Sequence, residues 1–360
     1  MIQYLKKFVF RKFKDSTIKH HELNYLFWEC TTRCNLNCIH CGSDCSKDSK
    51  YDDMPMDDFL KAVDTIDQKA KNFIVVFTGG EPLMRKDIEL CGKALRKRNA
   101  RWSIVTNGHL YNEKRHNSLL SAGMGALTIS LDGLEESHNW MRNSKESFIL
   151  ALNAIELAAS TRRLNFDVVT CVNQKNITEL SKIKDLLVSK KVPAWRLFTI
   201  IPIGRALQNA DLMLSDNQFV ELMEFITEQR KHKDIDIKFS CEGFVGKYEP
   251  KVRDIFFFCR AGINIGSVLI DGSISACPNI SRDFTQGNIY TDNLNEVWQN
   301  KFQPFRHREW TKRGRCEHCK DHKDCQGNGF HNWHGEKKNV LVCHKGKIDN
   351  ASTTVKKITQ

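Results

Sequence analysis

From residue 25 to about residue 202, the chain repeats one alternation of short and long segments. Short β-branched and aromatic runs, which are typical of strands, alternate with longer amphipathic stretches, which are typical of helices. The strand-like runs are Tyr25–Glu29, Phe73–Thr78, Trp102–Thr106, Ala126–Leu131, Phe166–Val172 and Trp195–Ile201. The clearest helical stretches are Met56–Ala70, Asp87–Arg98, Glu146–Ala159 and Ile177–Ser189. Strands that are each followed by a helix predict parallel βα units in an α/β fold. Six such units are too few for a closed eight-fold barrel, which leaves a partial, open barrel or a doubly wound sheet.

The pattern changes after a further helical stretch at Ser215–Lys231. Val268–Ser275 indicates a β-hairpin, because Asp271 and Gly272 would supply the two residues of positive φ in a type I′ turn. Beyond residue 300 the chain is polar and rich in His and Cys, so bound metal is the expected source of its order. These changes predict an N-terminal basic amphipathic extension over 1–24, a barrel domain over 25–234, a Cys-rich domain over 235–345 and a mobile tail over 346–360.

The number and positions of the cysteines indicate which kind of chemistry the protein carries out. No stretch approaches the roughly 18–20 apolar residues of a transmembrane helix, and the N-terminus lacks the apolar core of a secretory signal. We therefore expect a cytoplasmic protein, in which 14 cysteines indicate metal or redox chemistry rather than a disulfide scaffold. Five cysteines lie between residues 30 and 45 and four between residues 316 and 343, whereas Cys91, Cys171 and Cys241 are scattered.

The first cluster contains a specific spacing. Cys34, Cys38 and Cys41 follow the first strand as C-x3-C-x2-C, in a loop at the strand edge where parallel βα proteins place their chemistry. Three thiolates on one loop can hold three irons of a [4Fe–4S] cluster and leave the fourth iron open to a small molecule. A zinc site completed by Cys30 or Cys45 is the structural alternative.

Together with other segments, this motif resembles the signature of radical S-adenosylmethionine (SAM) enzymes, C-x3-C-x-Φ-C, in which His40 takes the usually aromatic position. The other matching segments follow strand ends: Gly79-Gly80-Glu81-Pro82, similar to the GGEP motif, Thr106-Asn107-Gly108, Ser130-Leu131-Asp132-Gly133, similar to the SLDG segment, and Arg142. The resemblance covers about residues 25–205. It implies a partial (β/α)6 TIM-like barrel that binds SAM and a [4Fe–4S] cluster.

The resemblance also implies a role for each matching residue. Cys34, Cys38 and Cys41 would ligate the cluster and carry catalysis, while SAM chelates the open iron. The implied SAM-binding residues are His40, Gly79, Gly80, Glu81, Pro82, Asn107, Ser130, Asp132 and Arg142. Among these, Gly79 and Gly80 would let backbone carbonyls reach the SAM amino group, and Glu81 would accept a hydrogen bond from it. Ser130 and Asp132 would bind the ribose, and Arg142 the carboxylate. Reductive cleavage of SAM would yield a 5′-deoxyadenosyl radical that abstracts hydrogen from the substrate.

The C-terminal cysteines resemble the SPASM extension, which usually carries two auxiliary iron–sulfur clusters. The matching residues are Cys259, Gly272-x4-Cys277, Cys316-x2-Cys319-x5-Cys325 and Cys343. The last four cysteines would hold the outer cluster. Gly329 stands where the pattern has a further cysteine, so an inner cluster keeps only Cys259 and Cys277. Cys241, His331 or His334 could complete it, its fourth iron could be open, or it could be absent. One or two auxiliary clusters are therefore expected, with structural zinc as the alternative.

The SPASM resemblance implies a peptide or protein substrate, and the radical chemistry implies a flavodoxin- or ferredoxin-like electron donor. An excess of 55 Lys and Arg over 43 Asp and Glu agrees with an acidic partner, and no RNA-binding module is evident. In the sulfatase-maturing subgroup an Asp follows the hairpin cysteine as base, but Pro278 stands there, so that activity is not implied.

Two other functions remain open at this point. One is a radical SAM enzyme that acts on a small molecule or RNA. The other is a metal-stabilised binding protein without catalysis, against which the intact segment from Gly79 to Pro82 argues. The basic and aromatic stretch Tyr4–Phe13 forms an amphipathic helix packed on the barrel, or it touches a membrane surface or a partner.

Overall fold

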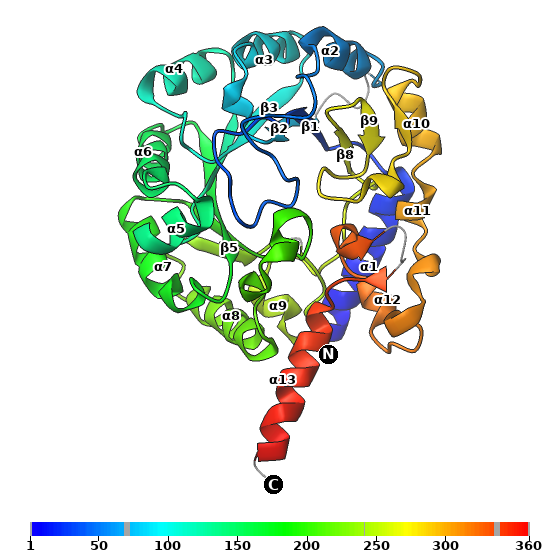
Figure 1. The fold of residues 1–360 in the computed structure, drawn as a ribbon. Helices are drawn as coiled ribbons and strands as arrows, with labels where there is room; N and C mark the ends of the chain where they lie inside the picture. The colour runs from blue at the N-terminus through cyan, green and yellow to red at the C-terminus, as the bar shows by residue number, and fades with distance from the viewer. Residues whose placement is uncertain (1, 68–72, 241, 335–338, 359–360) are drawn as a thin grey trace.

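A computed structural model of the chain describes residues 2–67, 73–240, 242–334 and 339–358 (Figure 1). Within these residues, ten strands form one sheet in the order β10-β9-β8-β1-β2-β3-β4-β5-β6-β7. The strands are β1 Tyr25–Thr31, β2 Ile74–Gly79, β3 Arg101–Thr106, β4 Ala126–Ser130, β5 Asn165–Val172, β6 Ala194–Thr199, β7 Asp236–Phe239, β8 Ile265–Val268, β9 Ser273–Ser275 and β10 Gly287–Asn288, with β11 Trp333–His334 and β12 Asn339–Val340 paired separately. The helices are α1 Ile2–His20, α2 Met56–Asp64, α3 Ile88–Lys97, α4 Glu113–Ser121, α5 Glu135–Arg142, α6 Ser147–Ala159, α7 Leu180–Ser189, α8 Asp216–Gln229, α9 Glu249–Val252, α10 Leu294–Asn300, α11 Gln303–Arg306, α12 His322–Cys325 and α13 His344–Ile358.

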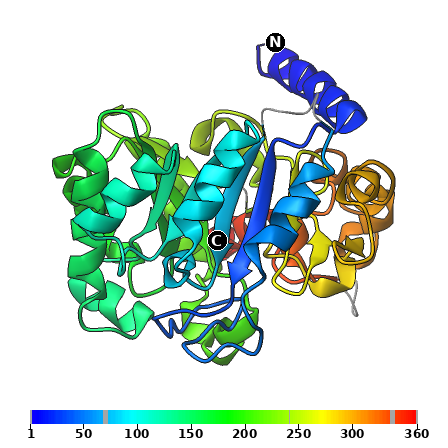
Figure 2. The same ribbon diagram turned by 90° about the horizontal axis from the view of Figure 1, so that it is seen from above.

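The strands β1 to β7 pair in sequence order and all in parallel. The helices that connect them lie on the outside of the curved sheet (Figures 1 and 2). This arrangement confirms the partial, open barrel and excludes the doubly wound sheet, in which helices cover both faces. The core lies between the sheet and its helices, as where the ring of Trp28 on β1 stacks on Phe59 of α2 at 4.1 Å between centroids.

All six strands expected from the sequence are present, with ends that differ by one or two residues. The seventh barrel strand, β7, was not expected, because its four residues Asp236–Phe239 alternate charged and apolar side chains too briefly to stand out. The helix expected at Met56–Ala70 ends at Asp64, and its last expected residues fall outside the described part of the chain. The helix expected at Ile177–Ser189 begins with a 3-10 turn over Ile177–Glu179.

The sheet continues beyond the boundary that the sequence predicts near residue 235. β7 pairs with β6 on one side of the barrel, and β8 pairs in parallel with β1 on the other. The Cys-rich region is therefore built onto the barrel sheet, because the hairpin of β8 and β9 extends it past β1.

The turn of this hairpin differs from the predicted type I′ turn. Gly272 has a φ of +82°, but Asp271 is not among the residues of positive φ. The amide of Gly272 donates to the carbonyl of Leu269 at 2.9 Å, and the amide of Leu269 donates to the carbonyl of Ser273 at 2.9 Å. The turn is thus one residue wider than a two-residue turn, and glycine alone takes the left-handed position.

Both chain ends form helices. Residues 346–360, expected as a mobile tail, instead belong largely to α13, which packs on α8 and buries Ile348 and Ala351. Ile348, Ala351, Val355 and Ile358 follow one another at intervals of three or four residues, which is the spacing of one helix face, so the sequence carries a helical signal that the expectation of a tail did not use. Among the described residues, no helix has both the length and the apolar character that a membrane crossing requires.

Candidate active site

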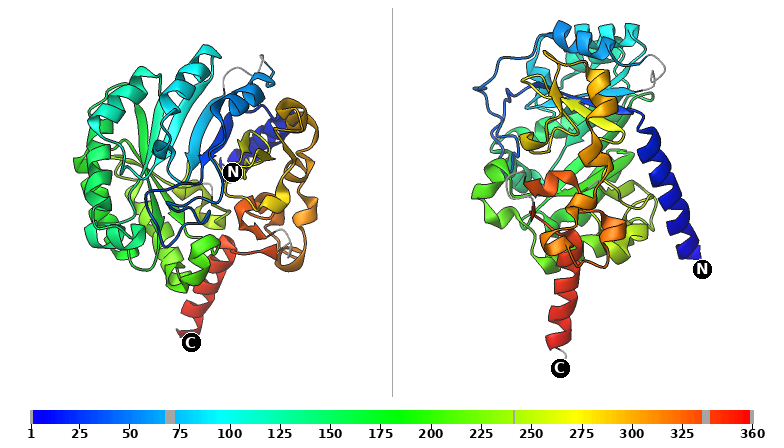
Figure 3. Two further views of the ribbon diagram at one scale, coloured as in Figure 1. Left: turned by 45° about the horizontal axis from the view of Figure 1, so that its top comes forward. Right: turned by 90° about the vertical axis from the view of Figure 1, so that its right-hand side faces the viewer.

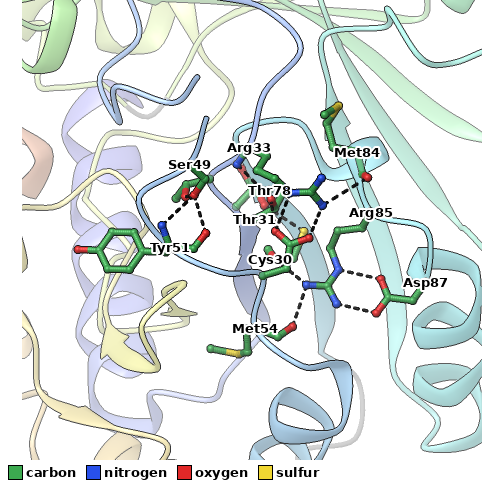
Figure 4. Close-up of polar contacts among 12 residues, drawn as sticks. Cys30, Thr31, Arg33, Ser49, Tyr51, Met54, Thr78, Met84, Arg85 and Asp87 are labelled. Carbon is green, nitrogen blue, oxygen red and sulfur yellow. Dashed lines mark hydrogen bonds and ion pairs between the residues drawn. The ribbon is translucent and has the colours of Figure 1, made fainter. Parts of the chain in front are cut away.

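The loop between β1 and α2 carries the cysteine motif, and Arg85 fixes where this loop starts and ends (Figure 4). The Arg85 side chain is buried, and its Nη1 donates at 2.8 Å to the carbonyls of both Cys30 and Met54. A bidentate contact with Asp87, at 2.8 and 2.6 Å, orients the guanidinium. Because Cys30 precedes the motif and Met54 follows it, one cation joins the two ends of the loop.

A second set of contacts, next to those of Arg85, also holds the two ends of the loop together. The Thr31 hydroxyl and the Arg33 guanidinium both donate to the Asp53 carboxylate, and Arg33 also reaches the carbonyl of Met84 (Figure 4). Arg33 holds the pKa of Asp53 below its usual value despite partial burial. The loop is therefore tied to β1 and to the segment after β2.

Arg205, in the 3-10 helix Gly204–Gln208 after β6, clamps the middle of the loop. Its Nε donates to the carbonyl of Cys38 at 2.7 Å and its Nη2 to the carbonyl of Cys45 at 3.0 Å. Its Nη1 contacts the Asp44 carboxylate at 2.8 Å, and its backbone amide donates to the carbonyl of Cys41 at 3.0 Å. One residue far along the chain thereby shapes the backbone around Cys38 and Cys41.

The segment Gly79-Gly80-Glu81 packs directly on the start of the cysteine loop. The Gly80 amide donates to the carbonyl of Thr31 at 2.8 Å, and the Glu81 amide donates to the carbonyl of Arg33 at 2.9 Å. A Cβ at Gly79 would lie 2.0 Å from the Thr31 oxygen, and one at Gly80 would lie 2.2 Å from the Arg33 oxygen. The glycines are thus required for backbone packing, whatever they do toward SAM.

Glu81 and Asn107 connect three of the motifs. The fully buried Glu81 carboxylate accepts hydrogen bonds from the Leu83 amide at 3.1 Å, the Thr106 hydroxyl at 2.9 Å and the Asn107 amide at 2.8 Å. Burial raises the pKa of Glu81, although these donors work in the opposite direction. The Asn107 side chain in turn contacts the Cys34 sulfur at 3.8 Å and the Asn35 side chain at 3.0 Å.

Asp132 and Arg142 bind each other beneath the motif. Arg142 Nη2 lies 2.6 Å from Asp132 Oδ2, and Arg142 Nη1 lies 3.8 Å from the Cys38 sulfur. Burial works to raise the pKa of Asp132, but the charge of Arg142 outweighs it and holds the pKa below its usual value. His40 Nε2 lies 3.9 Å from the same carboxylate, and burial lowers the pKa of His40 to about 4, so the imidazole is neutral at pH 7.

The three motif thiols have different electrostatic surroundings. Burial raises the pKa of Cys34 to about 12, and it also raises the pKa of Cys38 against the charge of Arg142. A hydrogen bond from Cys45 lowers the pKa of Cys41 to about 6, and Arg205 acts in the same direction. Cys45 thus packs with the motif thiols, as the zinc alternative requires, and it is a fourth sulfur at the site.

A cavity of about 910 Å³ opens beside the motif. Its wall combines the cysteine loop, the ends of β5 and β6, and the Cys-rich region, including His40, Cys41, Cys171, Glu242, Pro278, Arg282 and His331. Burial raises the pKa of Glu242 to about 7, and the Thr199 hydroxyl donates to its carboxylate at 2.7 Å. Pro278 lines the cavity at the position after the hairpin cysteine, so no carboxylate enters from there.

The C-terminal cysteines form a second group of thiols. Cys316, Cys319, Cys325 and Cys343 lie close enough for charge on one to affect another: beyond the effect of burial, a charge on Cys343 would raise the pKa of Cys316 and of Cys325. Cys259 is buried, and Arg308 donates to its carbonyl at 2.6 Å. Cys241 and the side chain of His334 lie outside what the structure describes.

The structure leaves no room for a side chain at Gly329, the position where the SPASM pattern has a cysteine. A Cβ there would lie 2.6 Å from the Cε1 atom of His331 and 2.7 Å from the Glu242 carbonyl oxygen. The imidazole of His331 therefore occupies the space into which a side chain at 329 would extend. Burial lowers the pKa of His331 to about 4, which leaves a neutral ring that can act as a ligand.

Comparisons with known proteins agree with this geometry. Residues 28–187 match the radical SAM superfamily, and residues 259–322 match an iron–sulfur cluster-binding domain, SPASM. The chain belongs to the radical SAM superfamily. Its radical SAM domain contains the loop, the Gly79–Pro82 segment and Arg142, and its SPASM domain contains the hairpin cysteine Cys277. Members of this superfamily that resemble the chain are named as synthases and maturases, and the chain is an enzyme.

Three similar proteins illustrate the range of these enzymes. The AdoMet-dependent heme synthase of Oleidesulfovibrio alaskensis is 26% identical over 318 residues, which are 83% of this chain and 81% of that protein. The mycofactocin maturase MftC of Mycobacterium tuberculosis is 26% identical over 308 residues, 84% of this chain and 77% of that protein. Streptococcus suis SuiB bound to its precursor peptide SuiA has the same fold, with a TM-score of 0.70 and 16% identity over 91% of this chain and 78% of that one.

The residues present fit the cofactors of the superfamily. Three thiols lie together on one anchored loop, and hydrogen-bonding atoms that remain buried without a described partner, His40 Nδ1, Asn35 Nδ2 and Arg142 Nε, surround them. When bound, a [4Fe–4S] cluster with SAM supplies a radical that removes hydrogen from carbon. This chain's own residues position the thiols through Arg85, Arg205 and Asn107.

Sequence reasoning missed Arg85 and Arg205, since neither belongs to a motif. The signal for Arg85 was its place three residues after Pro82, just beyond the second motif-bearing segment. Arg205 offered only its place after a barrel strand, since its contacts with Cys38 and Cys45 span 167 and 160 residues.

Proposed function

We propose that the chain uses its SAM-derived radical to modify a peptide or protein. The observation that carries this proposal is the cavity of about 910 Å³, whose wall is shared by the radical SAM and SPASM domains. A cavity open to solvent along the cysteine loop admits one segment of a longer chain while the remainder of that chain stays outside. The likeness to the maturase MftC, and to the fold of SuiB with its bound precursor peptide, supports the same substrate class.

The charges in the cavity also favour a peptide over a small polyanion. Arg205 is engaged by Asp44 and by loop carbonyls, and Arg282 is engaged by Glu29 at 3.3 Å and Asp271 at 2.6 Å. His40 and His331 have a pKa of about 4 and carry no charge at pH 7. Lys50 is the one further cation that lines the cavity among the described residues, so few cations are left to bind several carboxylates at once.

Sequence similarity favours a second candidate, an iron-porphyrin substrate. The chain is 26% identical to the heme synthase of O. alaskensis over most of both lengths. A porphyrin with several carboxylates would require new partners for them in this cavity, or release of Arg205 and Arg282 from their present contacts.

A deuterium-transfer experiment separates the two candidates. The purified protein, loaded with clusters under anaerobic conditions, is incubated with SAM, dithionite and an extract of cells grown in heavy water. Hydrogen abstraction from a true substrate then appears as deuterium in 5′-deoxyadenosine. We expect the transfer to disappear when the extract is first digested with proteinase K and its large fragments are removed. Transfer that persists in a protease-treated ultrafiltrate, or that is restored by deuterated iron coproporphyrin, would reject the peptide proposal.

We further propose the ligand sets. Cys34, Cys38 and Cys41 hold the radical cluster, with SAM bound near His40, Gly79 to Pro82, Asn107, Ser130, Asp132 and Arg142. Cys316, Cys319, Cys325 and Cys343 hold an outer auxiliary cluster, and Cys259, Cys277 and His331 contribute to an inner one. A flavodoxin- or ferredoxin-like protein supplies the electron. About eight to twelve irons per chain without zinc would support these assignments, whereas about four irons with one zinc would make the SPASM region a structural zinc site.

A further inference from the structure

Helix α1 presents an apolar face that no other described part of the chain covers. Leu5, Phe8 and Val9 are 61%, 52% and 58% exposed. Together with Phe13, they make up four of the twelve large hydrophobic side chains that are exposed among the described residues. Leu5, Phe8 and Val9 lie three and four residues apart, so they share one face of the helix.

The opposite face of α1 is attached to the body of the protein. The ring of Phe10 contacts those of Phe256 and Phe258 at 5.5 and 5.8 Å between centroids. Arg11 forms an ion pair with Asp324 at 2.7 Å, and Lys7 approaches the same carboxylate at 3.5 Å. The helix is therefore anchored by one side, and its exposed apolar face is a fixed feature of the surface.

Basic side chains lie along α1 together with the apolar face: Lys6 lies beside it, Lys12 follows Phe8 by four residues on the same side of the helix, and Lys19 lies toward the C-terminal end of the helix. Lys6, Lys12 and Lys19 are exposed, and none of them has an ion-pair partner within the described ranges. The Lys12 ammonium lies 5.9 Å from the centre of the Phe8 ring, so charge and apolar surface adjoin. Asp15 is the one acidic residue in α1.

We propose that α1 binds the surface of an anionic lipid bilayer, with Leu5, Phe8 and Val9 inserted between headgroups and Lys6, Lys12 and Lys19 paired with lipid phosphates. An anchored helix with an apolar face and basic side chains along it is suited to lie in the interface plane. A protein partner of matching shape would need carboxylates around an apolar groove, whereas an anionic bilayer offers both features over any area.

This orientation keeps the active site accessible. α1 lies on the side of the molecule opposite the loop that carries Cys34 to Cys41 (Figures 2 and 3). A chain bound to a bilayer through α1 would direct its cavity away from the lipid.

The test is co-sedimentation of the full-length, cluster-loaded protein with vesicles. We expect binding to phosphatidylcholine vesicles that contain phosphatidylglycerol, weak binding to pure phosphatidylcholine, and loss of binding at high salt. The double variant Leu5→Ser/Phe8→Ser should lower the partition coefficient about tenfold or more for each residue replaced. The charge-reversal variant Lys6→Glu/Lys12→Glu should remove the preference for anionic lipid.

The matched control is Leu90→Ser/Ile149→Ser, which replaces two equally exposed residues, at 61% and 54%, on barrel helices α3 and α6. It should bind vesicles as the wild type does. Far-UV circular dichroism and the unfolding temperature verify that each variant is folded. Equal binding by wild type and the α1 variants, or no binding to anionic vesicles, would overturn the proposal. So would a dimer in light scattering that the α1 substitutions dissociate, since a second copy would then cover the face.

Discussion

Replacing Arg205 with methionine tests whether the clamp on the cysteine loop controls cluster binding. The substitution keeps an unbranched side chain about as long as the aliphatic part of arginine but removes the donors to the carbonyls of Cys38 and Cys45, at 2.7 and 3.0 Å. Hydrogen bonds from a charged donor contribute about 1.5–3 kcal/mol each. The contact with Asp44 adds about 0–1 kcal/mol at most, because the Asp44 side chain is 61% exposed. The two carbonyl bonds therefore dominate, and their loss costs about 3–6 kcal/mol.

The loss of these hydrogen bonds destabilises the closed form of the loop, in which Cys38 and Cys41 lie close together. If cluster binding requires the closed loop, iron affinity should fall at least about a hundredfold, since every 1.4 kcal/mol is a factor of ten. The assay loads wild type and Arg205→Met anaerobically and measures the rate at which a chelator removes iron, together with the electron paramagnetic resonance signal of the reduced protein. Sulfide and protein content are measured on the same samples.

Two control variants distinguish the effect of the Arg205 charge from the effect of its hydrogen-bond geometry. Asp44→Asn removes the exposed partner alone and should retain iron as the wild type does. Arg205→Lys keeps the charge but cannot reach both carbonyls with a planar fork, so it should lose iron at an intermediate rate. If Arg205→Met resists the chelator as well as wild type does, the loop holds its shape without the clamp and the reasoning fails.

Six further single substitutions test other parts of the structure. Cys34→Ala, Cys38→Ala and Cys41→Ala should each abolish release of 5′-deoxyadenosine from SAM, and full release by any one of them would contradict the ligand assignment. Cys316→Ala should keep SAM cleavage but lose modified substrate, as measured by mass spectrometry, because the outer cluster is expected to lie away from SAM. Gly80→Ala should unfold the protein at a markedly lower temperature or abolish folding, since its Cβ would lie 2.2 Å from the Arg33 carbonyl oxygen; a normal unfolding temperature would show that the two segments can separate at little cost. Burial lowers the pKa of Lys14, so the folded chain is destabilised by this charge at pH 7 and Lys14→Met should raise the unfolding temperature. That gain should shrink as the pH rises through the lowered pKa, because the wild type then loses the buried charge; a gain that does not change with pH would assign the effect to packing alone.

The barrel could be predicted from the sequence because each strand and each helix of a parallel βα unit has its own local pattern of apolar residues. Each strand is a short buried run and each helix has its own period, so six strands could be located within one or two residues. The shortest barrel strand, β7, could not be located in this way, because four residues carry too little periodicity and its pairing partner β6 lies some 40 residues earlier. The pairing of β8 with β1 could not be predicted from the sequence either, since it joins segments about 240 residues apart.

The motifs identified the site residues, but the contacts of those residues came from the fold. Asp132 and Arg142 were expected to face SAM separately, and the structure pairs them at 2.6 Å. Glu81 was expected to accept a hydrogen bond from SAM, and its carboxylate already receives three hydrogen bonds from the chain. These contacts require residues from different strand ends, whose proximity depends on the curvature of the sheet.

The sequence by itself determined the chemistry of this protein, because cysteine spacing and the Gly79–Pro82 segment are local patterns that specify which ligands are available. Tertiary structure alone decided how those ligands are held: Arg85 and Arg205 shape the loop, His331 fills the space beside Gly329, and α1 turns its apolar face outward. The physical reason is that hydrogen bonds and burial depend on which residues lie close together in space, whereas the sequence gives only how far apart residues are along the chain.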